Sequence, residues 1–318
     1  MGNREGFKKI SALLLCIGVM AMSAGCGGGG GGSSGALAGV TATPPQTAMW
    51  LMGLALLEEK LLAQEAITTN INTYNQAFLA NQKTTCSNGG SSSVSGSLSS
   101  INFVASNCSS NSITANGSAD LSWKTVNYGK CLNVNVPTNL TYNYTFTNLS
   151  LSQTNPTELM SANGELTLAE SLPTCSASSF TVPFQLSVSS GAPLTVHFVV
   201  TSSSLSTSFD GTVNTFNGTV TGIYNSSSQL TNINYSFSGT FTLQNSPGTY
   251  SFSSSSTDPF VIDYATSSAF SSGALNVAGP NETDVLTITA PGQVTVTTTI
   301  NGVSKATSET LLSFLGSS

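Results

Sequence analysis

Charged side chains are scarce in this chain. They make up 7% of its 318 residues, whereas about a quarter is usual in a globular domain. Eight lysine and arginine residues stand against 14 acids, which gives a formal net charge of −6 at pH 7, and Arg4 is the only arginine. Nucleic-acid binding and electrostatic docking on anionic lipid both need clustered basic side chains. The composition therefore argues against both of these partners.

Residues that carry chemistry are equally scarce. His197 is the only histidine, and it alternates with the apolar residues Val196 and Phe198. We expect it on the opposite face of a strand from them, as a surface residue. The sequence has no Gly-x-Ser-x-Gly nucleophile elbow, phosphate-binding loop or dinucleotide-binding fingerprint. We therefore predict that the protein is not an enzyme and uses no cofactor or metal.

Acidic pairs are the remaining candidates for catalysis. Asp258 and Asp263 form one pair, and Glu282 and Asp284 form another. Two carboxyl groups can hydrolyse a glycosidic bond without a histidine. Asp258-Pro259 and the segment 281–284 are typical turn sequences, where acids are ordinarily capping or solvated groups. We expect no catalysis at either pair.

The start of the chain is typical of a secretion signal. Basic residues such as Arg4 precede an apolar run at 10–24, and small residues follow up to Cys26. The apolar run is too short to span a membrane, and the order of charge, apolar core and small residues is that of a signal peptide. Residues 1–25 are therefore predicted to be removed on export.

Ala24, Gly25 and Cys26 resemble the lipobox of bacterial lipoproteins. In that family signal peptidase II cleaves before the cysteine, which then carries acyl chains such as palmitate. The resemblance implies lipid attachment at Cys26. Gly27 follows the cysteine, whereas lipoproteins retained at the inner membrane typically have Asp at that position. The resemblance therefore implies location in the outer membrane of a Gram-negative envelope. Ser23 stands where the family usually has leucine, and cleavage by ordinary signal peptidase, giving a soluble secreted protein, is the alternative.

Residues 26–46 predict a flexible tether, because six consecutive glycines at 27–32 precede serine and glycine and the segment ends in two prolines. An amphipathic helix is expected over residues 47–82, with Thr47 as its N-cap. Its first part, 49–57, is apolar nearly all round and too short to cross a bilayer. We favour packing of this part in a protein core, with contact to a membrane surface as the alternative.

In residues 83–318 the apolar period changes to two. Apolar and polar residues alternate in four runs: 140–146, 180–188, 233–241 and 294–300. Such alternation predicts antiparallel strands, about a dozen in all. Pro247-Gly248 and Asn301-Gly302 are typical turn sequences between them. The predicted fold is mainly β: a curved antiparallel meander, either a half-barrel or a sandwich, with the N-terminal helix packed on it.

A weak repeat runs through this predicted sheet. An apolar residue, any residue, glycine, any residue and a second apolar residue recur around these glycines: Gly96, Gly117, Gly164, Gly211, Gly218 and Gly239. Glycine inside a strand marks a bulge, a bend or a close approach. Placed on successive hairpins, it would allow a long sheet to coil.

Four cysteines follow Cys26: Cys86, Cys108, Cys131 and Cys175. An even number in an exported chain predicts two disulfides, and three pairings are available. Because sequential strands usually lie side by side, we favour Cys86–Cys108 and Cys131–Cys175. A metal site is the alternative, but no closely spaced cysteines and no histidine partner support it.

The segment from Cys86 to Val126 resembles a repeat of uncharacterised β-rich lipoproteins from proteobacteria. An aromatic strand containing Phe103 ends in Asn107-Cys108, and an Asn-Gly strand follows at Asn116-Gly117. The resemblance implies a Cys86–Cys108 bridge. It implies no activity, because that group has none assigned.

Together these features predict a membrane-anchored envelope lipoprotein with a non-enzymatic structural or interaction role. Its partners would be a membrane, through the lipid, and another protein or a second copy of the chain, through sheet edges that carry little charge. The alternative is a carrier of lipid or another apolar ligand, held between a helix at 47–80 and a concave sheet. The carrier requires that helix to move when ligand enters.

Overall fold

The computed structural model describes most of the chain beyond residue 81 and two short segments before it: 40–41, 43–49, 51–52, 82–97, 100–110, 113–123, 127–131, 134–138, 141–154, 157–170, 174–176, 178–188, 192–201, 206–227, 229–244, 246–264 and 270–314. Residues 1–39, which include the predicted signal peptide, Cys26 and most of the tether, lie outside the described residues. Residues 53–81 of the predicted helix lie outside them as well.

Strands dominate the described chain, with these bounds: β1 (Val40–Thr41), β2 (Gln82–Thr85), β3 (Ser91–Ser97), β4 (Ser100–Ser110), β5 (Ile113–Trp123), β6 (Asn127–Cys131), β7 (Val134–Thr138), β8 (Thr141–Thr154), β9 (Thr157–Glu170), β10 (Thr174–Cys175), β11 (Ser179–Val188), β12 (Leu194–Thr201), β13 (Ser206–Tyr224), β14 (Leu230–Leu243), β15 (Ser246–Ser254), β16 (Phe260–Asp263), β17 (Phe270–Ala278), β18 (Glu282–Ala290), β19 (Gln293–Ile300) and β20 (Val303–Thr310). Residues 44–49 and 51–52 are helical. A second short helix, α4 (Leu311–Phe314), follows β20.

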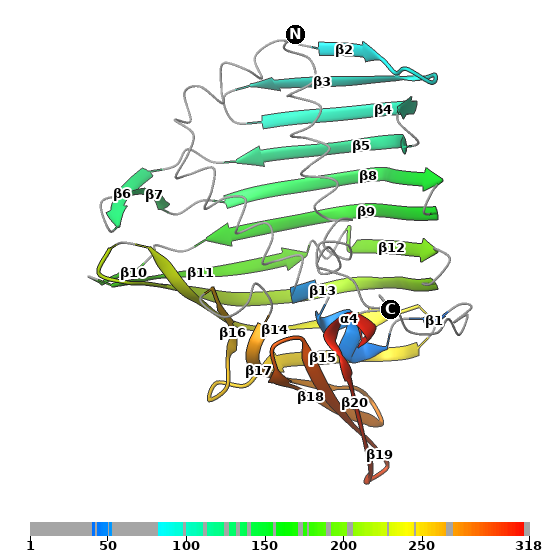
Figure 1. The fold of residues 1–318 in the computed structure, drawn as a ribbon. Helices are drawn as coiled ribbons and strands as arrows, with labels where there is room; N and C mark the ends of the chain where they lie inside the picture. The colour runs from blue at the N-terminus through cyan, green and yellow to red at the C-terminus, as the bar shows by residue number, and fades with distance from the viewer. Residues whose placement is uncertain are drawn as a thin grey trace.

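Within the described residues, 18 of these strands form one sheet, and β6 pairs with β7 in a separate hairpin. Neighbours in the sheet follow the order of the chain, from β2 at one edge to β20 at the other (Figure 1). At some positions two strands lie in line: β11 and β12 both lie between β9 and β13, and β15 and β16 both lie between β14 and β17. The two-residue strands also lie in line with longer ones: β10 pairs with the start of β11 beyond β9, and β1 pairs in parallel with the start of β13 beyond β14. In Figure 1 the strands from β14 onward turn away from those above them, so the sheet twists along its length. The predicted mainly β, antiparallel meander with a short N-terminal helix is confirmed.

The alternating runs are strands as predicted, in β8, β11, β14 and β19. Asn301-Gly302 forms the two-residue turn between β19 and β20, with φ values of 50° and 80°. The turn predicted at Pro247-Gly248 is wrong, because this dipeptide lies inside β15. The chain reverses before it, at Gln244, where a register shift next to Leu243 ends the regular pairing of β14 with β15.

Aromatic rings fill the core of the C-terminal half. Phe216, Phe237, Phe252 and Phe260 are all at most 5% exposed, and neighbouring ring centroids lie 5.4–6.0 Å apart. Burial of one such ring stabilises the fold by about 1.5–3 kcal/mol. Gly239 lies beneath Phe252, because a Cβ at that position would stand 2.6 Å from the ring. This repeat glycine therefore leaves space for an aromatic side chain.

Bulges line up across the N-terminal half of the sheet. Asn107 on β4 and Asn148 on β8 adopt positive φ values of 46° and 45°, and the strand register shifts next to each of them. An asparagine of the following strand caps each bulge: Asn116 Oδ1 accepts a hydrogen bond from the Asn107 backbone N–H at 2.7 Å, and Asn163 Oδ1 accepts one from the Asn148 N–H at 3.1 Å. The Ala-Asn-Gly copies of the repeat are therefore structurally equivalent bulge caps.

Gly117 shows why this repeat needs glycine. Its φ is +90°, and a Cβ there would stand less than 3.0 Å from the carbonyl oxygen of Asn148 on the neighbouring strand. Any side chain would strain the backbone and collide with backbone atoms that cannot move aside. The predicted close approach inside a strand is confirmed at this position.

The N-terminal helix begins earlier than predicted. Thr47 is not the N-cap: residues 44–49 are helical, and Thr43 caps them. The Gln46 side-chain oxygen accepts a hydrogen bond from the Thr43 backbone N–H at 2.7 Å, and the Thr47 N–H donates to the Thr43 carbonyl at 2.9 Å. This is a capping box with prolines in the first two helical positions, where a missing N–H costs nothing. The end of the predicted tether, 26–46, is therefore folded.

The described part of this helix is packed in the core. Ala48, Met49, Leu51 and Met52 are each at most 5% exposed. The Gln46 side-chain amide donates to the carbonyl of the last residue of α4, so the two short helices contact each other. Core packing, which we favoured over membrane contact for residues 49–57, is confirmed for the described ones.

Candidate functional site

The Cys86–Cys108 disulfide fastens the turn before β3 to the end of β4. Its Cα atoms lie 5.3 Å apart, and both cysteines are buried. Backbone hydrogen bonds reinforce the same contact: the Asn88 N–H donates to the Ser109 carbonyl and the Ser109 N–H donates to the Gly89 carbonyl, each at 2.9 Å. The predicted bridge is confirmed, and it holds the turn against the Asn107 bulge.

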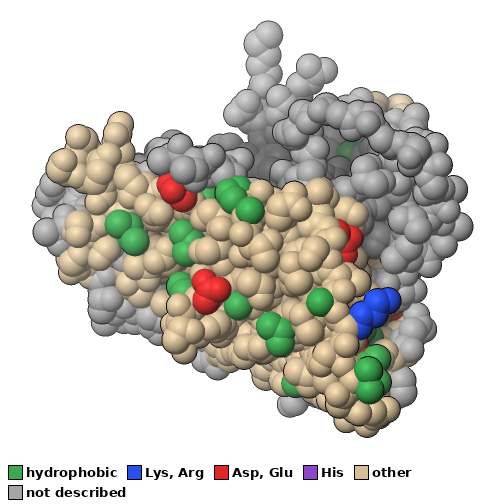
Figure 2. Space-filling view, turned by 60° about the horizontal axis from the view of Figure 1, so that its bottom comes forward, with side chains coloured by type: hydrophobic (Ala, Val, Ile, Leu, Met, Phe, Trp, Pro, Cys, Tyr) green, Lys and Arg blue, Asp and Glu red, His purple; other side chains and the backbone are tan. Residues whose placement is uncertain are grey.

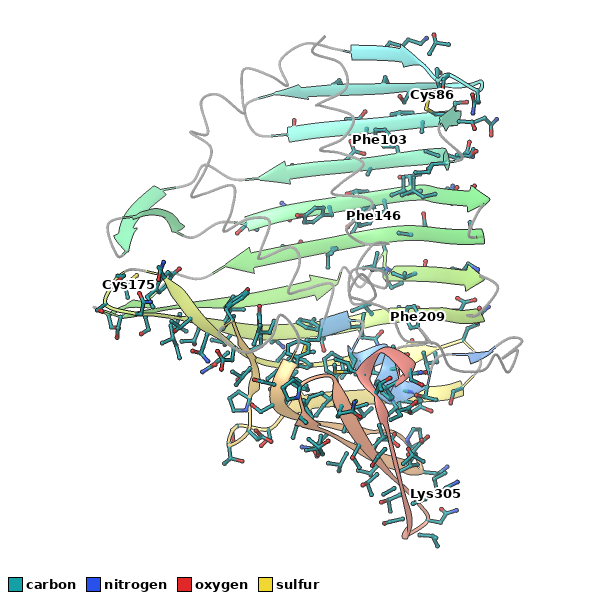
Figure 3. All side chains as sticks on the ribbon, viewed as in Figure 1. Cys86, Phe103, Phe146, Cys175, Phe209 and Lys305 are labelled. Atoms are coloured by element: carbon teal, nitrogen blue, oxygen red, sulfur yellow. A yellow bond between two sulfur atoms is a disulfide. The ribbon has the colours of Figure 1, made fainter. Side chains whose placement is uncertain are left out.

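Cys175 is also disulfide-bonded. It is the last residue of β10, which pairs with β11, and its side chain is exposed. Figure 3 shows Cys86 near the right-hand ends of the upper strands and Cys175 near the left-hand ends of the strands below them. Cys131 ends β6, and its side chain lies outside the described ones. The pairing Cys131–Cys175 stays a prediction, and so does lipid attachment at Cys26, which lies outside the described residues.

His197 lies on the outer face of β12, as predicted, and forms an ion pair with Asp210 on β13. The two residues are direct cross-strand neighbours, and His197 Nδ1 lies 3.4 Å from Asp210 Oδ2, with the side chains 38% and 37% exposed. The Gln244 side-chain amide lies against the same carboxylate. In the amide orientation that satisfies both groups, its nitrogen donates a hydrogen bond to Asp210. On the other side, Ser161 of β9 is the strand neighbour of His197.

This arrangement places serine, histidine and aspartate side by side on three strands. Catalysis by such a set needs a hydrogen bond from serine to histidine and free N–H groups for an oxyanion. Among the described side chains, no hydrogen bond joins Ser161 to His197, and the backbones of β9, β12 and β13 pair with each other here. The arrangement of Ser161, His197 and Asp210 fits an exposed ion pair between the last two residues. Such a pair contributes about 0–1 kcal/mol to stability.

Glu282 and Asp284 are not in a turn, so that prediction is wrong. Both belong to β18, where Asp284 faces inward with Leu286 and Ile288. The alternation of these three positions was the signal that could have placed Asp284 on the core face. Asp284 is 1% exposed. Thr298 of β19 donates a hydrogen bond to its Oδ1 at 2.5 Å, whereas its Oδ2 has no hydrogen-bond partner.

Burial raises the pKa of both carboxyl groups. For Asp284 burial is the largest cause, and the hydrogen bond from Thr298 offsets part of it. For Glu282 burial again comes first, and repulsion by Asp284 raises the pKa further. Two neighbouring carboxyl groups that both favour the neutral form can share one proton. This pair is therefore a pH-sensitive element of the fold.

Asp258 lies in a bend after β15, as its sequence predicts, and its backbone N–H donates to Ser255 Oγ at 3.2 Å. Its carbonyl accepts a hydrogen bond from the Ala274 N–H at 3.0 Å. Asp263 is the last residue of β16 and pairs with Asn232 on β14. The backbone of this loop is thus fixed by structural hydrogen bonds.

The surface of the described part is mainly neutral and polar. In Figure 2 the described part of the visible face is mostly uncharged polar side chains and backbone, with small separate hydrophobic and acidic spots and one basic spot. Within that part, no three His, Cys, Asp or Glu side chains gather as a metal site would need. No helix there is both long enough and apolar enough to cross a bilayer.

The β20 strand forms an exposed edge of the sheet. It pairs along its whole length with β19, and residues 303–308 are all exposed, with Val303 at 74%. Its charged residues are Lys305 and Glu309. Figure 3 places Lys305 at the far end of the molecule from Cys86. An edge strand of this length can accept a further strand.

No protein-family model, curated protein or solved structure matches this chain.

Proposed function

We propose that the protein is a lipid-anchored lipoprotein of the cell envelope, whose β sheet has a structural or interaction role without catalysis. The observation that carries the proposal is the order of basic start, apolar run, small residues, Cys26 and glycine tract. The Gly27 position extends the proposal to the outer membrane. The Cys86–Cys108 disulfide supports export, because disulfides persist in oxidising compartments.

The structure supports a tether that ends close to the fold. The described chain enters the sheet at β1 and the core at the helix that Thr43 caps. Residues 27–39 remain as spacer between Cys26 and the fold. A glycine-rich coil of that length, as the composition predicts, would have a root-mean-square span of about 20 Å. The sheet would therefore be held close to the membrane surface.

The buried helix favours a structural role over the carrier alternative. A carrier would need the helix to leave the sheet when ligand enters. Its described residues pack in the core from Gln46 to Met52, and a capping box fixes the start of the helix. Release of this segment would expose the apolar side chains at a cost of about 1.5–3 kcal/mol for each large one.

Substitution of Cys26 tests the anchor. Cys26→Ser removes both the acylated thiol and the cleavage site of signal peptidase II, so the protein should lose its acyl mass and keep residues 1–25. Cys16→Ser is the matched control, because Cys16 lies in the predicted signal peptide, and this variant should carry the acyl mass and lose residues 1–25. A Cys26→Ser variant that carries the acyl mass and lacks residues 1–25 would overturn the proposal.

A further inference from the structure

We infer that two copies of this chain pair through β20 in antiparallel orientation, with Thr307 on the two-fold axis and Lys305 of each copy opposite Glu309 of the other. The inference rests on the proposed interaction role of the sheet and names its partner. It does not require the lipid anchor, because the edge belongs to the folded sheet.

The β19–β20 hairpin determines which backbone groups face the open edge. Asn301 and Gly302 form its two-residue turn, so Ile300 and Val303 are a hydrogen-bonded pair. The odd-numbered residues of β20 therefore direct N–H and C=O toward β19. The even-numbered residues, from Ser304 to Thr310, direct theirs outward. These outward groups are available to another strand.

The charges select one register for a second β20. In an antiparallel pair, two opposite residues either both direct their backbone groups toward the other strand or both direct them away. Two copies of β20 can therefore pair only with even-numbered residues opposite even-numbered ones and odd-numbered residues opposite odd-numbered ones. A two-fold axis at Lys305 would bring two lysines together, and an axis at Glu309 would bring two glutamates together. An axis at Thr307 places Lys305 opposite Glu309 twice. These odd-numbered pairs lack backbone hydrogen bonds, so their side chains approach most closely.

The pairing would be modest in solution. Four even-numbered residues on each copy could form about eight backbone hydrogen bonds, but the contact lies at the small end of specific interfaces. A lone lysine at an edge ordinarily guards against other strands. Glu309 is half-buried, and its Oε2 accepts a hydrogen bond from Ser313 Oγ of the same copy at 3.1 Å, which holds the carboxylate in place. It offers a partner to Lys305 in a single register, so the charge that opposes other pairings favours this one. Confinement of both copies to one membrane raises their effective concentration.

Cysteine cross-linking tests the register. In the full mature protein in its native membrane, Thr307→Cys should form a disulfide-linked dimer under mild oxidation, because the two Cα atoms would lie about 4.5 Å apart. Ser304→Cys is the matched control, exposed on the same strand. Its two copies would lie roughly 20 Å apart, so it should form no dimer. No dimer from Thr307→Cys, equal dimer from both variants, or a ladder of larger species would overturn the inference.

Charge reversal tests independently whether the pairs of Lys305 with Glu309 select the register. Lys305→Glu or Glu309→Lys in the Thr307→Cys background should slow dimer formation roughly tenfold, because each creates two like-charged pairs. The combination of both reversals should restore the rate. Equal slowing by the double variant would overturn the charge-selected register. Acyl mass measured on the same samples separates the two proposals: dimer without acyl groups would keep this inference and remove the anchor, and acylated monomer would do the reverse.

Discussion

Asp284→Asn should stabilise the protein at neutral pH. The carboxyl group is 1% exposed, and one of its oxygens has no hydrogen-bond partner. A buried acceptor without a partner costs about 1–3 kcal/mol, and more when it is charged. Asparagine keeps the oxygen that accepts from Thr298, places an NH2 donor beside Glu282 where the second oxygen lies, and does not ionise. We expect the free energy of unfolding at pH 7 to rise by about 1–2 kcal/mol.

The sign of the pH dependence follows from the raised pKa. In the folded state Asp284 holds its proton to higher pH than in the unfolded chain, where the pKa is near the ordinary value of about 3.9. Between the two pKa values the folded state binds more protons, so stability falls as pH rises through that window. The Asp284→Asn variant should lose much of this fall, and the share due to Glu282 should remain.

Urea unfolding at several pH values from 4 to 7, with disulfides intact, measures both effects. Asp120→Asn is a matched control, because Asp120 is exposed on β5, and it should change stability by less than about 0.5 kcal/mol. Thr298→Val should destabilise the protein at pH 7 by about 1–3 kcal/mol, because it removes the hydrogen bond that Thr298 donates to Asp284. An Asp284→Asn variant that is less stable at pH 7 and keeps the full pH slope would refute this reasoning.

Three further variants test the disulfide, the bulges at Asn107 and Asn148, and the ion pair of His197 with Asp210. Joint replacement of Cys86 and Cys108 by alanine should lower the free energy of unfolding by about 3 kcal/mol, because the bridge closes a loop of 22 residues; a loss below about 1 kcal/mol in urea unfolding would show that the bridge constrains little. Gly117→Ala should cost at least about 1–3 kcal/mol through strain and its clash with Asn148, and an unchanged thermal midpoint would refute the bulge argument. His197→Ala should cost less than about 1 kcal/mol at pH 6, and a larger loss would show that the ion pair is more than a surface contact.

Much of the fold could be predicted because strand periodicity is local. Val294 and Val296 alternate with threonines, and the same two residues are buried on β19. The turn at Asn301-Gly302 could be predicted for the same reason, since its residues favour positive φ. These features depend on neighbours in the sequence and little on the rest of the molecule.

One error arose where a distant contact decides the structure, and the other where a local signal was overlooked. Asp284 has the composition of a turn around it, but pairing with Thr298 on β19 extends the strand through it. Thr43 was assigned to the tether because prolines follow it, although its spacing from Gln46 is that of a capping box. The edge position of β20 depends on the order of the whole sheet, which periodicity alone does not specify.

Mass spectrometry of the intact protein, extracted gently from membranes, is the measurement to make first. We predict a mature chain that begins at Cys26, carries acyl groups and shows no further bound mass. A chain that begins elsewhere and carries no acyl group would disprove the anchored lipoprotein. An acylated chain with an additional mass that leaves on denaturation would support the carrier instead of a structural role.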